Sequence, residues 1–252
     1  MTGVRLRHIV LVVPEVDPAS RLLGDVLGID EVFREPPGLD LEMENAVLAL
    51  PGGYFLEVCA GTGPDAPPAR YERRFGPGGY MLLLQFRDFD VARARAEEAG
   101  ARVVFEYDTP AHHELHLHPA DTGAAIVGVE WGSEWDAWRW AGTSWRAGIR
   151  SPDVRGLSRV RVGAPDPRVL AERWERTLGV DFVRDGDAMR ARLDEGPGIV
   201  FEPWERPHSR VHGIDLLVSD ADAILERARR VGVETDGDVL RLLGLDIALS
   251  RE

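Results

Sequence analysis

The chain has 252 residues, of which 30 are basic and 43 acidic, and its formal net charge at pH 7 is -13. This charge disfavours nucleic acid and anionic membrane surfaces as partners. Every residue of the lysine and arginine class is arginine, which excludes Schiff-base chemistry because that chemistry needs a lysine amine.

A single cysteine, Cys59, excludes an intramolecular disulfide and fits a reducing compartment. Residues 1–17 lack the apolar segment and small residues of a signal peptide. No apolar run in the chain reaches the length that spans a membrane. We therefore expect a soluble, cytoplasmic protein.

The first predicted elements form a strand, a helix and then three strands. The strand covers residues 8–13, which are apolar after the first position. The helix has Asp17 as its expected N-cap, Pro18 in its first turn and Gly28 at its end. Extended segments are predicted at 31–34, 46–50 and 54–59. Residues 65–74, rich in proline and arginine, are expected to form a surface loop.

The same βαβββ order recurs three times along the chain. In the second pass the strand covers 80–86, the helix runs from Asp90 to Gly100, and strands follow at 101–107, 113–118 and 125–130. In the third pass the strand begins at Leu157, the helix runs from Asp166 to Gly179, and strands follow at 181–184, 189–193 and 198–202. The fourth pass begins near Gly213, has its helix between Asp220 and Gly232, and is shortened. Such repeats indicate duplicated units that bury their faces against one another.

Five tryptophans lie between the second and third passes: Trp131, Trp135, Trp138, Trp140 and Trp145. A flexible linker would be poor in aromatic residues. We therefore expect residues 132–154 to be a packed connector, with a ligand-stacking lid as the alternative. The predicted domains on either side of it are residues 1–131 and 155–252.

A histidine-rich stretch, HHELHLHPADTGAAIVGVEW at 112–131, concentrates the residues that could carry chemistry. From position 113 polar and apolar residues alternate, which predicts a strand. Leu115 and Leu117 would face a core, and Glu114, His116 and His118 would share the other face. A turn at 119–123 and a second strand ending at Glu130 should follow. The alternative is a solvated sheet face that carries histidines by chance.

These features resemble the vicinal oxygen chelate superfamily, which contains glyoxalase I, methylmalonyl-CoA epimerase, extradiol dioxygenases and bleomycin-binding proteins. The resemblance is carried by four tandem units and by the segments HIVLVV, YFLEVC and HLHPADTGAAIVGVE. The last segment is similar to the His-Pro-x-x-Thr-Gly-Gly strand-turn-strand of the epimerases. The implied fold is α+β, with four βαβββ units paired into two glyoxalase-like incomplete barrels.

In this superfamily a cup in the barrel holds a divalent metal. By resemblance His8 and Glu57 match two ligand positions, and the third falls on Tyr80 or Met81, which replace a histidine poorly. The fourth falls on Gly128, two residues before Glu130. His116 or His118, from the strand next to the closing one, could fill the missing position, and the predicted metal ligands are His8, Glu57, His118 and Glu130. This set suits Zn²⁺, Fe²⁺, Mn²⁺, Co²⁺ or Ni²⁺. The alternative is a cup without metal that uses His and Glu directly.

The corresponding positions of the second half hold Arg159, Glu202, Gly213 or His212, and Asp246. A guanidinium does not ligate metals. Arg159 would hold an anionic group of the substrate, or would pair with Glu202 as a structural ion pair.

The resemblance implies an enzyme that acts on a small oxygenated molecule by proton transfer, as an isomerase, epimerase or lyase. Glu57 and Glu130 are the predicted catalytic residues, because a carboxylate must move a proton beside a carbonyl group. The predicted substrate-binding residues are Glu114, His116, Tyr80 and Arg159. Two alternatives are a non-catalytic binder of a drug or natural product and an Fe²⁺ extradiol-type dioxygenase. The protein is expected to be a monomer or a homodimer.

Overall fold

The computed structural model describes residues 3–36, 42–149 and 151–251. The first half contains β1 (Val4–Val12), α1 (Val16–Leu27), β2 (Glu31–Phe33), β3 (Met43–Leu50), β4 (Tyr54–Gly61), α2 (Pro67–Phe75), β5 (Gly78–Phe86), α3 (Phe89–Glu98), β6 (Val103–Thr109), β7 (His112–Leu117), α4 (Pro119–Thr122) and β8 (Ile126–Gly132). The second half contains β9 (Val154–Ala164), α5 (Pro167–Leu178), β10 (Phe182–Asp185), β11 (Ala188–Ala191), β12 (Gly198–Pro203), β13 (Arg210–Val218), α6 (Ala221–Arg230), β14 (Glu234–Asp236), β15 (Val239–Leu242) and β16 (Leu245–Arg251). Two 3-10 turns, η1 (Arg139–Ala141) and η2 (Trp145–Gly148), lie between the halves.

The strands form two mixed eight-stranded sheets. Their hydrogen-bonded orders are β2-β3-β4-β1-β5-β8-β7-β6 and β10-β11-β12-β9-β13-β16-β15-β14. In each βαβββ unit the first and last strands pair in parallel, as β1 does with β4 and β9 with β12, because the helix provides the crossover. The expected α+β class with four paired βαβββ units is confirmed.

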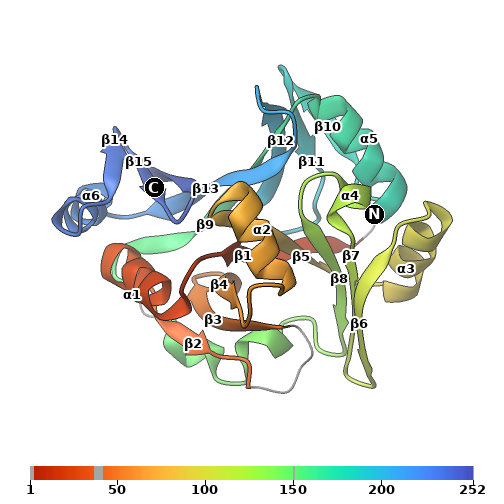
Figure 1. The fold of residues 1–252 in the computed structure, drawn as a ribbon, viewed down its shortest axis with the longest axis horizontal. Coiled ribbons are helices and arrows are strands. Elements are labelled where there is room, and N and C mark those ends of the chain that lie inside the picture. The colour runs from red at the N-terminus through yellow and green to blue at the C-terminus, as the bar shows by residue number, and fades with distance from the viewer. Residues whose placement is uncertain (1–2, 37–41, 150, 252) are drawn as a thin grey trace. The chain divides into compact units, whose positions relative to one another are not determined.

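Contacts divide the chain into two compact units, and each unit combines modules from both halves. Unit 1 comprises Met1–Arg7, Met81–Ala137 and Arg159–His212. Unit 2 comprises His8–Tyr80, Trp138–Ser158 and Gly213–Glu252. Strands β1, β5, β9 and β13 contribute residues to both. Within unit 1 helix α3 packs on α5, and within unit 2 α1 packs on α6 (Figure 1).

The predicted domains, 1–131 and 155–252, follow the sheets, whose strands lie within residues 4–132 and 154–251. The compact units cut across that division, because helices from opposite halves pack together. The proposed boundaries of the two domains, at residues 131 and 155, therefore stay a prediction.

Two segments expected to be irregular are short helices. Residues 65–74 were expected to form a loop, but Pro67–Phe75 is helix α2, with proline in its first turn. The turn expected after the histidine-rich strand contains α4, which ends at Gly123 with φ of 90°. A glycine suits this position because left-handed backbone is strained for other residues.

The helix N-caps predicted from the sequence are confirmed in the second half, whereas in the first half other residues occupy the N-cap positions. The Asp166 carboxylate accepts hydrogen bonds from the backbone N–H groups of Arg168 and Val169, at 2.9 and 3.3 Å. Helix α3 is capped by Asp88 and not by Asp90, and α1 starts after Glu15, so Asp17 lies inside its first turn.

Replacing the Asp166 cap with alanine is expected to lower the free energy of unfolding by about 1 kcal/mol, because the first backbone N–H groups of α5 lose their acceptor. Asp17→Ala is the matched control. Asp17 is an exposed carboxylate that pairs with Arg34 at 2.6 Å but caps no helix, so its loss should cost less. Urea unfolding of both variants measures the difference, and equal losses would contradict the capping role.

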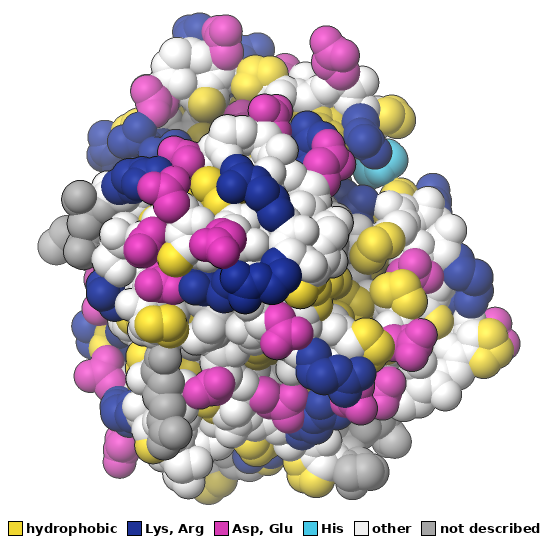
Figure 2. Space-filling model, turned by 90° about the vertical axis from the view of Figure 1, so that its left-hand side faces the viewer, with side chains coloured by type: hydrophobic (Ala, Val, Ile, Leu, Met, Phe, Trp, Pro, Cys, Tyr) yellow, Lys and Arg dark blue, Asp and Glu magenta, His cyan; other side chains and the backbone are white. Residues whose placement is uncertain are grey.

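Figure 2 shows arginine and acidic side chains interspersed over one face of the molecule. Ion pairs of this kind join Arg34 to Glu31 at β2, Arg230 to Glu226 within α6, and Arg251 of β16 to Asp222 of α6. Within the described residues, no helix combines the length and the apolar character needed to cross a membrane.

Candidate functional site

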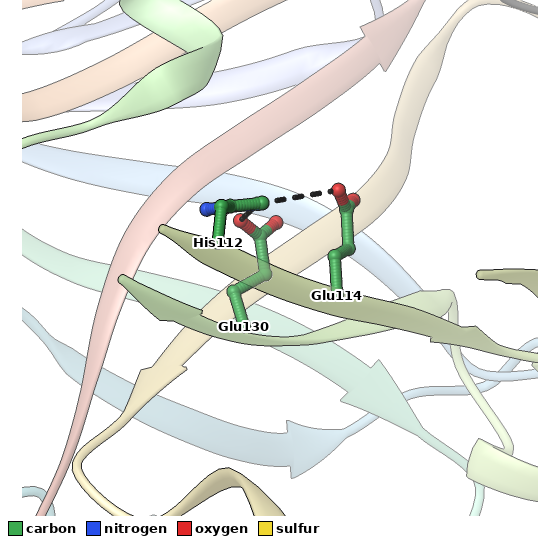
Figure 3. Close-up of side chains that lie close together, drawn as sticks. All are labelled: His112, Glu114 and Glu130. Carbon is green, nitrogen blue, oxygen red and sulfur yellow. Dashed lines mark ion pairs between the residues drawn. The ribbon is translucent and has the colours of Figure 1, made fainter. Parts of the chain in front are cut away.

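Unit 1 carries a cluster of buried histidines and carboxylates on β7 and β8. His112, Glu114 and His116 alternate along β7, so their side chains share one face. Glu114 lies directly opposite Glu130 of β8, and His116 lies opposite Gly128. Figure 3 shows the side chains of His112, Glu114 and Glu130 converging from the two strands. All four titratable residues are buried.

The contacts within this cluster centre on His112. Its Nε2 lies 3.5 Å from Oε2 of Glu114 and 3.5 Å from Oε2 of Glu130. The other oxygen of Glu114 contacts Nε2 of His116, and because an ionised carboxylate can only accept, that nitrogen donates. A Cβ at Gly128 would lie 2.6 Å from Cδ2 of Leu83 and 3.3 Å from Oε1 of Glu130, so a glycine here leaves room for both side chains.

The electrostatics of the cluster keep Glu114 ionised. Burial by itself raises the pKa of the Glu114 carboxyl, but the neighbouring charges of His116 and His112 outweigh it and lower the pKa to about 2. Such a group is a poor proton acceptor near neutral pH, because a general base works best when its pKa lies near the working pH. Glu114 is therefore better suited to holding a cation or a histidine than to moving a proton.

A second buried group lies in unit 2, where His8 of β1 faces Glu57 of β4. His8 Nε2 lies 3.2 Å from Glu57 Oε2, and both side chains are almost completely buried. The amide of Asn45 donates to Glu57 Oε1 at 3.1 Å. The Asn45 amide is itself oriented, because its oxygen accepts the backbone N–H of Glu35 at 2.9 Å.

The connector supplies the last member of this group. The indole Nε1 of Trp138 donates to Nδ1 of His8 at 3.2 Å. An indole N–H can only donate, so Nδ1 must be an acceptor and a neutral His8 carries its proton on Nε2. That Nε2 makes no hydrogen bond within the described residues.

This tautomer does not fit the metal predicted at His8 and Glu57. A cation on Nε2 would need the lone pair there and would move the proton to Nδ1. A proton on Nδ1 would point at the indole N–H of Trp138, which donates its hydrogen bond to that atom. Two N–H donors would then face each other. The arrangement therefore fits a close His–Glu contact and not a metal–histidine bond.

Aromatic rings pack around His8 in unit 2. Trp138 stacks on Phe55 with ring centres 6.3 Å apart, and Trp145 meets Phe55 edge-on at 5.2 Å. Trp138, Trp140 and Trp145 are all buried, which supports packing as the role of these connector tryptophans. Cys59 is also buried, and burial together with the charge of Glu57 raises its thiol pKa, so it is a poor nucleophile.

The remaining predicted site residues have other partners or positions. His118 follows the end of β7 and caps α4, where its Nδ1 accepts the backbone N–H of Ala120 at 3.1 Å. Tyr80 is buried with its ring 5.0 Å from that of Tyr71, and burial raises its pKa. Arg159 lies exposed on β9. The substrate-binding roles of Tyr80 and Arg159 stay predictions.

The second half has its own His–Glu pair in unit 1. His212 Nε2 lies 2.7 Å from Glu202 Oε1, and this partner, followed by the charges of Arg161 and Arg159, lowers the pKa of Glu202. Histidine is the closest partner of this carboxylate, and the Arg159–Glu202 ion pair stays a prediction. This pair is half-buried, unlike the His8–Glu57 pair.

Sequence reasoning missed His112, Asn45 and the contact of Trp138 with His8. The signal for His112 was available, because extending the alternation by one residue places it on the face of Glu114 and His116. The Trp138 contact joins residues that are 130 positions apart, and no local pattern predicts it.

Comparisons with known proteins agree with this architecture. The family model described as glyoxalase-like domain matches residues 6–178, and a second model of the same description matches 159–239. Mitochondrial methylmalonyl-CoA epimerase of Bos taurus is 26% identical over 130 residues, which cover 50% of this chain and 73% of that protein.

Two solved structures share the fold over nearly the whole chain. One is a hypothetical protein from Staphylococcus aureus, with TM-score 0.71, 12% identity and 99% coverage of both chains. The other is a mutant of 4-hydroxymandelate synthase from Streptomyces coelicolor, with TM-score 0.70, 20% identity, and coverage of 94% of this chain and 78% of that one. The chain therefore belongs to the glyoxalase-like domain family and is a tandem member of the vicinal oxygen chelate superfamily.

Proposed function

We propose that this chain is an enzyme of the isomerase or epimerase type, which moves a proton on the carbon beside a carbonyl group of a small oxygenated molecule. The observation that carries the proposal is the buried group around Glu57, in which Asn45 holds one carboxylate oxygen and His8 lies beside the other. A carboxylate fixed in this way is equipped to accept a proton from carbon.

The chemistry also needs a donor for the negative charge that develops on the substrate oxygen. His8 supplies one, because Trp138 holds it in the tautomer with a proton on Nε2, and that N–H has no acceptor among the described residues. A neutral N–H fixed beside the base stabilises an enolate oxygen without having to reorient during the reaction. Glu57 is thus the proposed base and His8 the proposed donor.

The similarity to a methylmalonyl-CoA epimerase supports the reaction type. It also places acyl-CoA thioesters on the panel of substrates to be screened, beside 2-oxo acids and hydroxy ketones. Glu130, the other predicted catalytic carboxylate, lies in the β7–β8 cluster beside His112, and its catalytic role stays a prediction.

Incubating the whole protein with this panel in D₂O tests the proposal. One compound should gain deuterium at the carbon beside its carbonyl group, detected by proton NMR and mass spectrometry, faster than without protein. Saturable binding with no exchange on any compound would favour the non-catalytic binder. Consumption of O₂ with the same compound would favour the dioxygenase.

A further inference from the structure

We infer that the β7–β8 cluster is a binding site for one first-row transition metal ion, held by His112, Glu114 and Glu130. The inference goes beyond the proposed function and does not rest on it, since that function uses His8 and Glu57. Only Glu130 of these three residues belongs to the ligand set that the family resemblance implied.

The separations of the three side chains fit ligands around an ion. Nε2 of His112 lies 3.5 Å from one oxygen of each glutamate, and the three ligand atoms all lie within 4.8 Å of one another. Tetrahedral bonds of about 2.0–2.1 Å place neighbouring ligand atoms roughly 3.4 Å apart. Charge-assisted hydrogen bonds are shorter, about 2.7–2.9 Å, so direct contact explains these distances less well.

Glu114 points an unsatisfied oxygen at this position. Its side chain is 1% exposed, and Oε2 accepts no hydrogen bond from any described residue. Leaving a buried carboxylate oxygen without a partner costs free energy, because water no longer solvates it. The other oxygen is held by His116, so the carboxylate is already oriented with Oε2 toward His112. A hydrogen-bonded neighbour of this kind typically positions a metal ligand.

Charge points to a cation. Glu114 and Glu130 are direct cross-strand partners, and both are buried. Like charges in that arrangement destabilise a sheet. The two positive charges of a divalent ion would offset the negative charges of both carboxylates.

The donor set selects the class of metal. An imidazole nitrogen together with two carboxylates suits Zn²⁺, Fe²⁺, Mn²⁺, Co²⁺ or Ni²⁺, whereas Ca²⁺ and Mg²⁺ prefer oxygen ligands throughout. Three protein ligands are also the number found at metal sites that keep a position open for water or another oxygen ligand.

The test uses the full chain without a histidine tag, loaded with Zn²⁺ or Co²⁺ and then desalted. Elemental analysis should find one ion per chain. Glu114→Gln and Glu130→Gln should each weaken Zn²⁺ binding by more than about 100-fold in calorimetry, and His116→Gln by about 10–100-fold. His113→Gln is the matched control: this histidine lies on the same strand but faces the other way, beside Asp108, and its loss should leave the affinity unchanged.

His8→Gln separates this site from the ligand set implied by the family. It should keep the ion if the site is on β7 and β8. X-ray absorption of the Zn²⁺-loaded wild-type protein needs no variant to fold, and it should count one imidazole at the ion. The inference is overturned if the wild-type protein binds no ion, if two imidazoles are counted, or if His8→Gln loses the ion while Glu114→Gln keeps it.

Discussion

Replacing Glu57 with glutamine is expected to lower turnover in the deuterium-exchange assay by about 10²–10⁴-fold, because the amide cannot accept the proton from carbon. The side chain keeps its size and its place beside His8. Its new NH₂ group faces the Asn45 amide, which already donates at that point, so a loss of about 1–2 kcal/mol in unfolding free energy should accompany the change.

The matched control is Glu202→Gln in the second half. Glu202 is also a glutamate beside a histidine, His212, on the last strand of its βαβββ unit. Its substitution should change the exchange rate by no more than a few-fold. The readouts are the exchange rate and the melting temperature of both variants. Loss of exchange in Glu202→Gln, with Glu57→Gln still active, would move the reaction to the other half.

The largest effect on stability is expected from Trp174→Ala. Trp174 is fully buried on α5, with its ring 5.1 Å from that of Phe201, and its Nε1 donates to the backbone oxygen of Thr122 at 3.0 Å. Alanine would leave a large cavity and an unpaired carbonyl group. The unfolding free energy should fall by about 3–5 kcal/mol.

Two further substitutions on or near this position separate the causes of that loss. Trp174→Phe keeps most of the aromatic packing but removes the hydrogen bond to Thr122, and it should cost less than alanine. Val169→Ala, on the same helix and 52% exposed, should cost less than about 0.5 kcal/mol. Urea unfolding measures all three. A loss at Trp174→Ala no larger than that at Val169→Ala would contradict the buried role.

The order of the elements could be predicted from the sequence because local patterns determine it. Alternation of polar and apolar residues predicts the strand that contains Leu115 and Leu117. An N-cap residue, Asp166, and a C-cap residue, Gly179, mark the two ends of α5. These signals depend on neighbouring residues only, since strand period and helix caps are local properties. The resemblance to the superfamily further predicts that the four βαβββ units pair into two barrels.

The composition of the site could be predicted only in part. The sequence predicts Glu57, Glu114, His116 and Glu130 as site residues, and the structure buries all four, while their roles stay predictions. His118 was grouped with them by alternation, but Pro119 ends the strand and begins a helix, so the His118 side chain caps α4 instead. The observed strand β7 begins and ends one residue earlier than the predicted strand. The cluster therefore contains His112 in place of His118.

Tertiary structure alone decided which tautomer His8 adopts and which modules pack together. The Trp138 indole reaches His8 across 130 residues, and helices from opposite halves meet in each compact unit. Residue types and spacing determined the strands, the helices and the acidic and histidine side chains available to a site. Partners distant in sequence are chosen by the packing of whole elements, so hydrogen-bond donors and helix neighbours become defined only when the chain is folded.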